Sequence, residues 1–467
     1  MNKKRAFILT LLLVILVGII SVNAGESNGV MASLPWVTEK FKDGESGVKN
    51  LSAEFVGKYQ IPMTSMSRIG NTRIYQAHKA TSAVEGNCGP DDTWFCTSWY
   101  DPDLVPGTVS PMATQSYIDT HVIKWAYSTG GYIRGATIEL MNDMSFVDDD
   151  FENLIQINKF GATLIGVPSL QTVGGHYALA VTIRDSTDLY GHKLVYLHYT
   201  GNDLKYSCLD SGSVYECEVI EQTYGFNSMG APSLQIAVDG SVGISYYKAA
   251  AGVRYAYPHE PTFLYPSNCG PGGNTWRCIT IFLGSGVGEF YPTVKLAAGN
   301  TRAESGIAFI YDDVLIPDTL YHAEYVGTGG NCGADRNPIG LTVNKWQCED
   351  ILGLGDLAAW YSPSFSIAIG PGGYSAIAFE YAPEELAPLA LYLTYPNARL
   401  GIDDGKWALQ GIDYAPTTTV ATGAQAALAF NAEGRGFISY LQEEEYQLPD
   451  VKFAWQPHMI FLPYTKH

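Results

Sequence analysis

The feature that most constrains this 467-residue chain is a short loop, bounded by two cysteines, that recurs in nearly the same letters. Three copies read Asn87-Cys88-Gly89 to Trp94-Phe95-Cys96, Asn268-Cys269-Gly270 to Trp276-Arg277-Cys278, and Asn331-Cys332-Gly333 to Trp346-Gln347-Cys348. A fourth close pair is Cys208 and Cys217. Recurrence at one place in each repeat predicts four disulfides that each stay within their own loop. Zinc sites and redox pairs need tighter Cys-x-x-Cys spacing, so we assign these cysteines a structural role.

Between these loops, short apolar runs alternate with turn residues. Residues 230–257 are the clearest copy: an apolar run at 232–238, an Asp239-Gly240 turn of the type that hairpins favour, and two further runs at 242–247 and 253–257. Four strands per unit, with the units in series, are typical of β-propeller blades. The chain is poor in Lys and Arg (28 together) and rich in Gly (49) and Tyr (31), which favours an all-β fold.

Seven units can be counted along the chain. We expect a proline, or a glycine in the last unit, to open the second strand of each, at Pro62, Pro111, Pro168, Pro232, Pro292, Pro363 and Gly423. The sequence thus predicts an all-β, seven-bladed β-propeller of four-stranded antiparallel blades with local disulfides, over residues 51–467. Because an open edge strand invites aggregation, residues 459–464 are expected to pair into the first blade and close the ring.

The N-terminal residues read as an export signal. Residues 1–24 combine a basic start, an apolar run and the small-residue site Val22-Asn23-Ala24, which is typical of a cleaved secretory signal peptide. The alternative, an uncleaved membrane anchor, has an apolar run at the short edge of what spans a bilayer. Residues 25–50 are polar without a clear period, and we expect a linker or strap there. The predicted product is a monomer that is secreted or held at the cell surface.

The chain is strongly acidic. Its net charge of −19 becomes (28 − 3) − 47 = −22 once Lys3, Lys4 and Arg5 leave with the signal. Such a charge repels phosphate backbones, which argues against a nucleic-acid partner. Calcium is the one cofactor that the acidic loops suggest, at Asp148-Asp149-Asp150 or Asp403-Asp404, although neither has the alternating spacing of a calcium loop. We therefore expect no metal or other cofactor.

The repeat combines a Tyr-Pro-Ser-Leu type strand, an Asp-Gly turn, an Ile-Ser-Tyr-Tyr strand, a Val-Arg-Tyr-Ala strand and an Asn-Cys-Gly…Trp-x-Cys loop. These motifs together resemble those of the secreted bacterial repeat proteins near the sialidase-like, Asp-box β-propellers. The resemblance covers nearly all of the chain after residue 24. Such repeat motifs indicate fold more than activity.

The resemblance suggests testing for a sialidase site, in which three arginines grip a carboxylate. Arg68-Ile69-Gly70 and Arg73-Ile74-Tyr75 are the closest strings, and Pro271 stands where the Asp-box has its aspartate. A glycosidase with two facing carboxylates is a further alternative. Its candidate acids are Asp101, Asp103, Glu139 and Glu289. No complete catalytic set emerges, so the sequence favours a non-catalytic protein and keeps a glycoside hydrolase as the alternative.

Aromatic residues gather in the connections that precede each proline. In a propeller these connections open at one end of the central channel, where aromatic faces can stack on sugar rings or apolar side chains. The predicted ligand-binding residues are Trp99, Tyr100, Asp101, Tyr224, Phe290, Tyr291, Trp360, Tyr361 and Tyr414. The competing interpretation is that these rings wedge neighbouring blades apart. The sequence thus predicts binding to an extracellular glycan or a surface protein, with a structural role in a cell envelope as a further alternative.

Overall fold

A computed structural model gives the structure of the protein. It describes residues 36–456 except 43–47, 57–58, 69–70, 158–161, 186–190, 202–207, 210–213, 225–227, 250, 274, 284–292, 314–315, 356–363, 371, 383–387, 398–404, 416–419 and 445–448. The predicted signal peptide and the predicted tail strand at 459–464 lie outside the described residues. Within them, no helix is long and apolar enough to cross a membrane.

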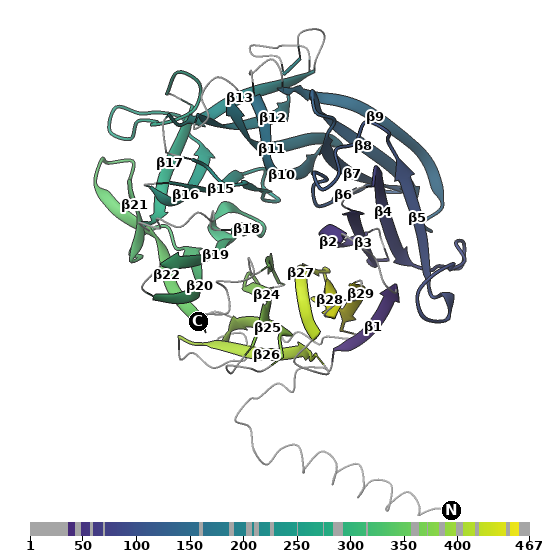
Figure 1. Ribbon diagram of the computed structural model, residues 1–467. Helices are drawn as coiled ribbons and strands as arrows, with labels where there is room; N and C mark the ends of the chain where they lie inside the picture. Colours follow the sequence, from purple (N-terminus) through teal and green to yellow (C-terminus); the bar gives the residue numbers. More distant parts are fainter. Residues whose placement is uncertain are drawn as a thin grey trace, which may run out of the picture.

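Seven antiparallel sheets surround a central channel, which confirms the predicted seven-bladed β-propeller (Figure 1). The strands of each blade are given from the channel outward. Blade one consists of β2 (Val48–Val56), β3 (Ile61–Arg68), β4 (Arg73–Lys79) and β5 (Trp94–Tyr100), and blade two of β6 (Ala113–Ser116), β7 (Thr120–Ser128), β8 (Tyr132–Met141) and β9 (Phe146–Gln156). Blade three consists of β10 (Ala162–Val173), β11 (His176–Asp185), β12 (His192–Tyr199) and β13 (Tyr215–Gln222).

Blades four to six follow in the same order from the channel outward. Blade four consists of β14 (Ser233–Ile236), β15 (Val242–Lys248), β16 (Gly252–Pro258) and β17 (Trp276–Phe282). Blade five consists of β18 (Val294–Ala298), β19 (Ser305–Asp313), β20 (Ile316–Tyr325), β22 (Thr342–Gly355) and, as its outermost strand, β21 (Cys332–Arg336). Blade six consists of β23 (Phe365–Ile369), β24 (Ser375–Tyr381), β25 (Ala390–Pro396) and β26 (Trp407–Asp413). Short 3-10 turns occur at Pro90–Asp92, Pro271–Gly273 and Arg302–Glu304.

The seventh blade joins the two ends of the chain. It consists of β27 (Val420–Phe430), β28 (Gly436–Glu444), β29 (Asp450–Trp455) and, as its outermost strand, β1 (Val37–Lys42). Val37 pairs with Trp455 and Lys40 with Lys452. The ring is therefore closed by residues from the segment in which a linker or strap was expected, whereas the expectation placed closure at the opposite end of the chain. Sequence reasoning missed β1 because six residues without clear alternation carry no strand signal on their own.

Three of the six prolines mark strands that face the channel, and so does Gly423, which lies within the innermost strand β27 and not in a second strand as predicted. Pro111 and Pro232 come just before β6 and β14, and Pro168 lies within β10. Only Pro62, in β3, lies in a second strand as predicted. The predicted units began instead with the outermost strand of the preceding blade, because a sequence repeat alone does not say which strand is innermost. Pro292 and Pro363 lie outside the described residues.

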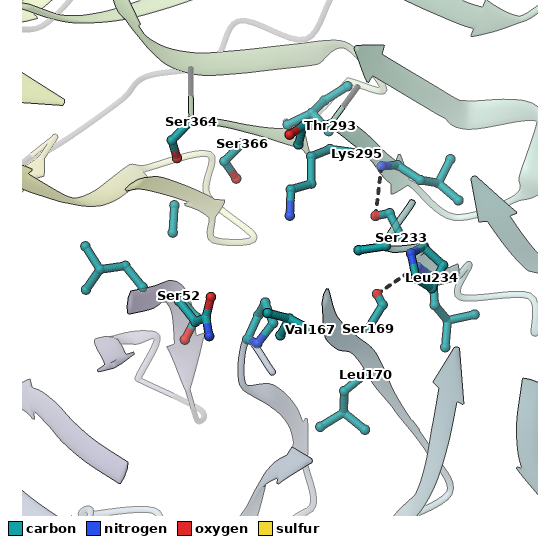
Figure 2. A pocket seen from close by; sticks show the side chains of 18 of the residues that line it. Ser52, Val167, Ser169, Leu170, Ser233, Leu234, Thr293, Lys295, Ser364 and Ser366 are labelled. Atoms are coloured by element: carbon teal, nitrogen blue, oxygen red, sulfur yellow. Dashed lines mark hydrogen bonds between the residues drawn. The ribbon is translucent and has the colours of Figure 1, made fainter. Parts of the chain in front are cut away.

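The hydrophobic core is divided among the interfaces between adjacent blades. Each of its seven clusters combines side chains from two neighbouring sheets, such as Tyr246 of blade four with Tyr196 of blade three. The channel at the centre is lined by the innermost strands (Figures 1 and 2). Packing thus fixes the blades against one another and leaves the channel open.

All four predicted disulfides form: 88–96, 208–217, 269–278 and 332–348. In the loop of blade four, the Asn268 side chain donates to the Cys278 carbonyl at 2.8 Å and accepts from the Cys278 amide at 2.7 Å, so it acts as a strand partner. Asn87 and Asn331 do the same for Cys96 and Cys348. This pairing explains why asparagine precedes the first cysteine.

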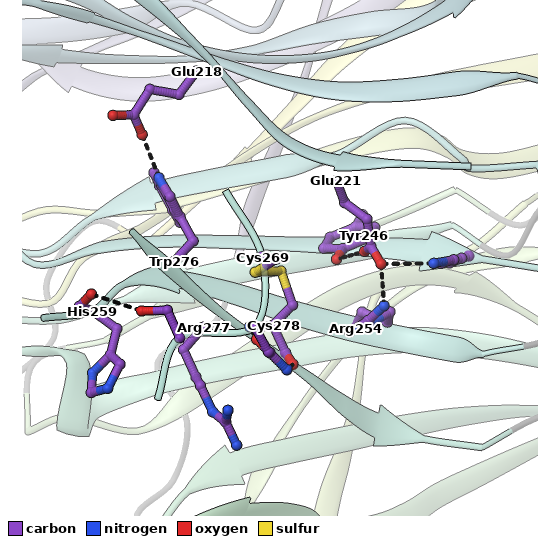
Figure 3. The surroundings of a disulfide bond; sticks show 12 residues. Glu218, Glu221, Tyr246, Arg254, His259, Cys269, Trp276, Arg277 and Cys278 are labelled. Carbon is purple, nitrogen blue, oxygen red and sulfur yellow. Dashed lines mark hydrogen bonds and ion pairs between the residues drawn. A yellow bond between two sulfur atoms is a disulfide. The ribbon is translucent and has the colours of Figure 1, made fainter. Parts of the chain in front are cut away.

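The glycine and tryptophan of the same motif are a matched pair. Gly270 has a φ of +87°, and a Cβ there would lie 2.6 Å from the Trp276 ring, so only glycine fits. Trp276 is buried against Tyr196 of the preceding blade, and its indole nitrogen donates to Glu218 (Figure 3). The motif therefore closes its loop and also anchors the blade to its neighbour.

The loop of blade five is longer and adds a fifth strand, which the sequence did not predict. The cysteines are 16 residues apart, against 8 or 9 in the other loops, and the extra residues form β21. β21 places Asp335 against blade four, where Arg277 Nε lies 2.6 Å and the Tyr257 hydroxyl 2.9 Å from its carboxylate. Lys345 completes the pairing at 2.8 Å.

Candidate functional site

The central channel holds a cavity of about 650 Å³ (Figure 2). Residues of the innermost strands β2, β10, β14, β18, β23 and β27 line it, together with Pro111 and Met112 just before β6. Its volume is within the range of small-molecule binding sites. Sequence reasoning missed this site because its residues come from six or more strands that are far apart in the chain and only meet when the ring closes.

One register position recurs around the cavity in blades three to seven. Its residues pair with the second strand of their own blade and immediately precede an apolar residue. They are Ser169, Ser233, Lys295, Ser366 and Ala427. Four of the five are small, and blade five alone has a long cation.

The serines at this position connect one blade to the next. The Ser169 hydroxyl accepts the Leu234 amide at 2.8 Å, and Ser233 accepts the Leu296 amide at 3.0 Å. Ser366 accepts the Leu428 amide at 3.1 Å. A lysine cannot accept such a bond, since its ammonium only donates. Lys295 thus gives up a contact between blades that its three serine equivalents make.

Lys295 extends into the open centre of the ring (Figure 2). Its side chain is partly buried, and burial lowers the pKa of its ammonium. The second lysine of the lining, Lys49, is exposed. Among the residues that the structure describes, the cavity lining contains no arginine, so the arginine cluster of a sialidase is not found there.

Glu54 lines the same cavity from β2, on a different side of the channel from β18 (Figure 1). Burial raises the pKa of this carboxyl to about 7. Near neutral pH it is therefore present in both the protonated and the ionised form. A cavity lined by an acid and a cation whose pKa values are both shifted by burial is a candidate binding site.

The predicted aromatic site is found as separate exposed rings. Tyr100 ends β5, Tyr224 follows β13 and Tyr414 follows β26, and their exposed fractions are 58%, 67% and 63%. Corresponding strands of a propeller run in the same direction, so the ends of these outermost strands lie on one face of the ring. The three rings belong to blades one, three and six and do not converge on one pocket.

Trp99 and Asp101 are held by specific contacts within the protein. The Trp99 ring stacks on Phe146 of blade two with centroids 5.5 Å apart, which fits the wedge interpretation. Asp101 is buried and accepts from the Tyr127 hydroxyl at 2.5 Å and from Arg134 Nη1 at 2.8 Å. Burial alone would raise the pKa of Asp101, but these hydrogen bonds outweigh it and lower the pKa.

The remaining predicted binding residues, Phe290, Tyr291, Trp360 and Tyr361, lie outside the described residues, as does the candidate acid Glu289. Of the other candidate acids, Asp103 is 3.8 Å from Arg134, and Glu139 is a half-buried residue of β8. These contacts do not identify a pair of facing catalytic carboxylates.

Of the two acidic runs considered for calcium, Asp148-Asp149-Asp150 lies in the described part of the chain. Asp148, Asp149 and Asp150 are exposed in β9, where successive side chains point to opposite faces of the sheet. No group of three His, Cys, Asp or Glu side chains among the described residues is arranged to hold a metal ion. Asp403 and Asp404 lie outside the described residues.

Comparison with known proteins gives no evidence about function, and the fold rests on the sheet topology described above. No family model matches the chain, and no curated protein matches it. Solved structures that match include AofleA from Arthrobotrys oligospora, with 10% identity, 84% of this chain and 93% of that chain covered, and a TM-score of 0.42. A protein of unknown function from Dyadobacter fermentans has 10% identity, coverages of 90% and 98%, and a TM-score of 0.39.

A Synechocystis apocarotenoid oxygenase variant also matches, with 9% identity, coverages of 93% and 95%, and a TM-score of 0.37. We draw no conclusion about function from these likenesses. The sialidase-like relationship suggested by the repeat motifs is not shown by any of them.

Proposed function

We propose that this protein is an exported, non-catalytic β-propeller that binds extracellular carbohydrate on the ring face where its outermost strands end. The observation that carries the proposal is the exposure of Tyr100, Tyr224 and Tyr414 at corresponding places in three blades. Exposed aromatic faces stack on the C–H faces of sugar rings, and a tyrosine hydroxyl adds a hydrogen-bonding group at the edge.

The spacing of the rings favours a repeating ligand. Because the tyrosines stand on separate blades, each offers a shallow contact of its own, and a polysaccharide could engage several of them at once. Simultaneous engagement raises the overall affinity without any deep pocket. Four disulfides support export, since such bonds persist in oxidising compartments.

A glycan array with the exported protein tests the proposal. Tyr100→Ala, Tyr224→Ala and Tyr414→Ala are each expected to weaken binding by about 2- to 10-fold, the range of one stacking contact. Tyr59→Ala is the matched control, because Tyr59 is 67% exposed but lies in the β2–β3 connection on the opposite face. It is expected to bind as the wild type does.

Two results would contradict the proposal. One is a triple tyrosine variant that keeps full binding to every glycan recognised by the wild type. The other is the absence of glycan binding together with tyrosine-dependent capture of a purified surface protein, which would favour the protein-binding alternative.

A further inference from the structure

We propose that the central cavity binds a small hydroxylated organic carboxylate, with Lys295 as the residue that holds its carboxylate. This inference goes beyond the proposed function, because it places a second ligand inside the channel and not on the ring face. It rests on the side chains that line the cavity of about 650 Å³.

Lys295 first supports this proposal, because it replaces the serine that blades three, four and six have at the same register position. Ser169, Ser233 and Ser366 occupy the same register position and each accept a backbone amide of the next blade. Lys295 makes no such contact, and its ammonium has no hydrogen-bond or ion-pair partner among the described residues. A partly buried cation that has no partner among the described residues favours an anion beside it.

The serine hydroxyls are the second argument. Each of the three oxygens already accepts one amide, which leaves its own proton to donate. Within the described part of the chain, none of these protons has an acceptor. Together with Lys295 they place several unused donors around one cavity. Unused donors favour a ligand rich in acceptor oxygens, and a carboxylate is such a group.

The size of the cavity and Glu54 narrow the ligand class. A volume of about 650 Å³ is far larger than a single water, which occupies about 30 Å³ in the liquid, so an inorganic ion would leave most of it filled with solvent. Glu54, contributed by β2, also has no partner among the described residues. As a carboxyl group it can accept from ligand hydroxyls, which favours a carboxylate that also carries hydroxyl groups.

The competing explanation is that Lys295 only fills space in the channel. The two explanations make different predictions for Lys295→Met, because methionine keeps an unbranched side chain of similar length and removes the charge. Lys295→Ser gives the residue that three other blades already use at this position, so this variant is expected to fold.

D-glucuronate and D-glucose are the probes, since they differ only in a carboxylate and a hydroxymethyl group on the same ring. Isothermal titration of the whole protein is expected to show saturable binding of glucuronate and no comparable binding of glucose. Lys295→Met and Lys295→Ser are each expected to weaken glucuronate binding by about 10- to 100-fold, the range of one charge-assisted hydrogen bond. Lys40→Met is the matched control, because Lys40 pairs with Asp450 at the outer edge of blade seven.

The proposal is overturned if glucuronate does not bind, if glucose binds equally well, or if both Lys295 variants retain wild-type affinity. A loss of glucuronate binding in Lys40→Met equal to that in Lys295→Met would also overturn it, since net charge would then explain the effect. Circular dichroism of each variant confirms that it is folded. The tyrosine variants of the ring face are expected to bind glucuronate normally, so this test fails or succeeds independently of the proposed function.

Discussion

The same residues recur from blade to blade at the outer edge of the ring, whereas one position in the central channel differs between blades. At the outer edge, Asn87, Asn268 and Asn331 make the same two hydrogen bonds to a cysteine in three different blades. In the channel, one register position has serine in three blades and Lys295 in another. Residues that repeat maintain the fold, whereas the residue that departs from the repeat creates the candidate binding site.

The outer edge also contains one loop that differs from the repeat, at the interface of blades four and five. There the longer cysteine loop adds Asp335, which is 2% exposed and contacts Arg277, Lys345 and two tyrosines. Every oxygen of this carboxylate has a donor, so the departure strengthens an interface between blades. A departure whose polar groups are all paired is structural, and one with unpaired groups is a candidate for function.

The largest expected effect is that of Asp335→Ala. It leaves Arg277 and Lys345 buried without their anion, and removing one partner of a buried ion pair costs about 3–5 kcal/mol of unfolding free energy. Urea unfolding measures the change. Asp119→Ala is the control, since Asp119 is exposed in a hairpin connection, and its effect is expected to stay within about 0.5 kcal/mol. An equally small effect of Asp335→Ala would mean that the interface does not depend on this carboxylate.

The same carboxylate makes stability depend on pH. Burial would raise the pKa of Asp335, but hydrogen bonds from Lys345, Tyr265 and Arg277 outweigh it and lower the pKa to about 2. Because the folded pKa is below the unfolded value of about 3.9, the stabilisation is present above pH 4 and is lost as the pH falls towards 2. Its size is roughly 2–3 kcal/mol.

Unfolding of the wild type and of Asp335→Asn between pH 2 and 6 checks this dependence. The difference in stability between them is expected to shrink as the pH falls from 4 to 2. A difference that stays constant over this range would show that Asp335 does not titrate there.

A pair of substitutions at equivalent positions sharpens the comparison between blade interfaces. Glu218 follows Cys217 and accepts from the indole of Trp276, whereas Ile279 follows Cys278 and leaves the buried indole of Trp346 without a partner among the described residues. Glu218→Ile is expected to cost about 1–3 kcal/mol, and Ile279→Gln to add up to about 1 kcal/mol. Thermal unfolding should show opposite signs; a loss of stability in both would mean that packing, and not the indole bond, decides.

The smallest expected effect is that of Lys295→Ser on stability without ligand. Serine restores an acceptor that three other blades use and removes a partly buried charge, so unfolding free energy is expected to rise by up to about 1 kcal/mol. Lys295→Met, which restores no acceptor, is the comparison. A clear loss of stability in Lys295→Ser would make the lysine part of the structural repeat.

The fold could be predicted from the sequence to the extent that it repeats. The four disulfides and seven blades follow from motifs written several times, and the structure confirms both. β1 and β21 were missed because each occurs once and neither alternates clearly. Asp101 was predicted on a ring face but is buried, since a sequence does not show that Tyr127 and Arg134 will meet it.

The channel site is harder to predict for a geometric reason. Lys295 and Glu54 are far apart in the chain, and neither belongs to a motif. Once the blade boundaries are known, Lys295 is visible as a lysine aligned with serines. That signal depends on knowing which strand is innermost, and the sequence repeat alone left this undetermined.

The pairing of β1 with β29 sets an order of events during synthesis. Residues 37–42 are synthesised long before their partner at 450–455. The first blade and its successors can form while the chain is still growing. β1, the outermost strand of the seventh blade, has no strand to pair with until β29 has been synthesised. The circle therefore cannot close before the seventh blade has been synthesised, and any delay in closure prolongs exposure of the edge of β29 to neighbouring chains.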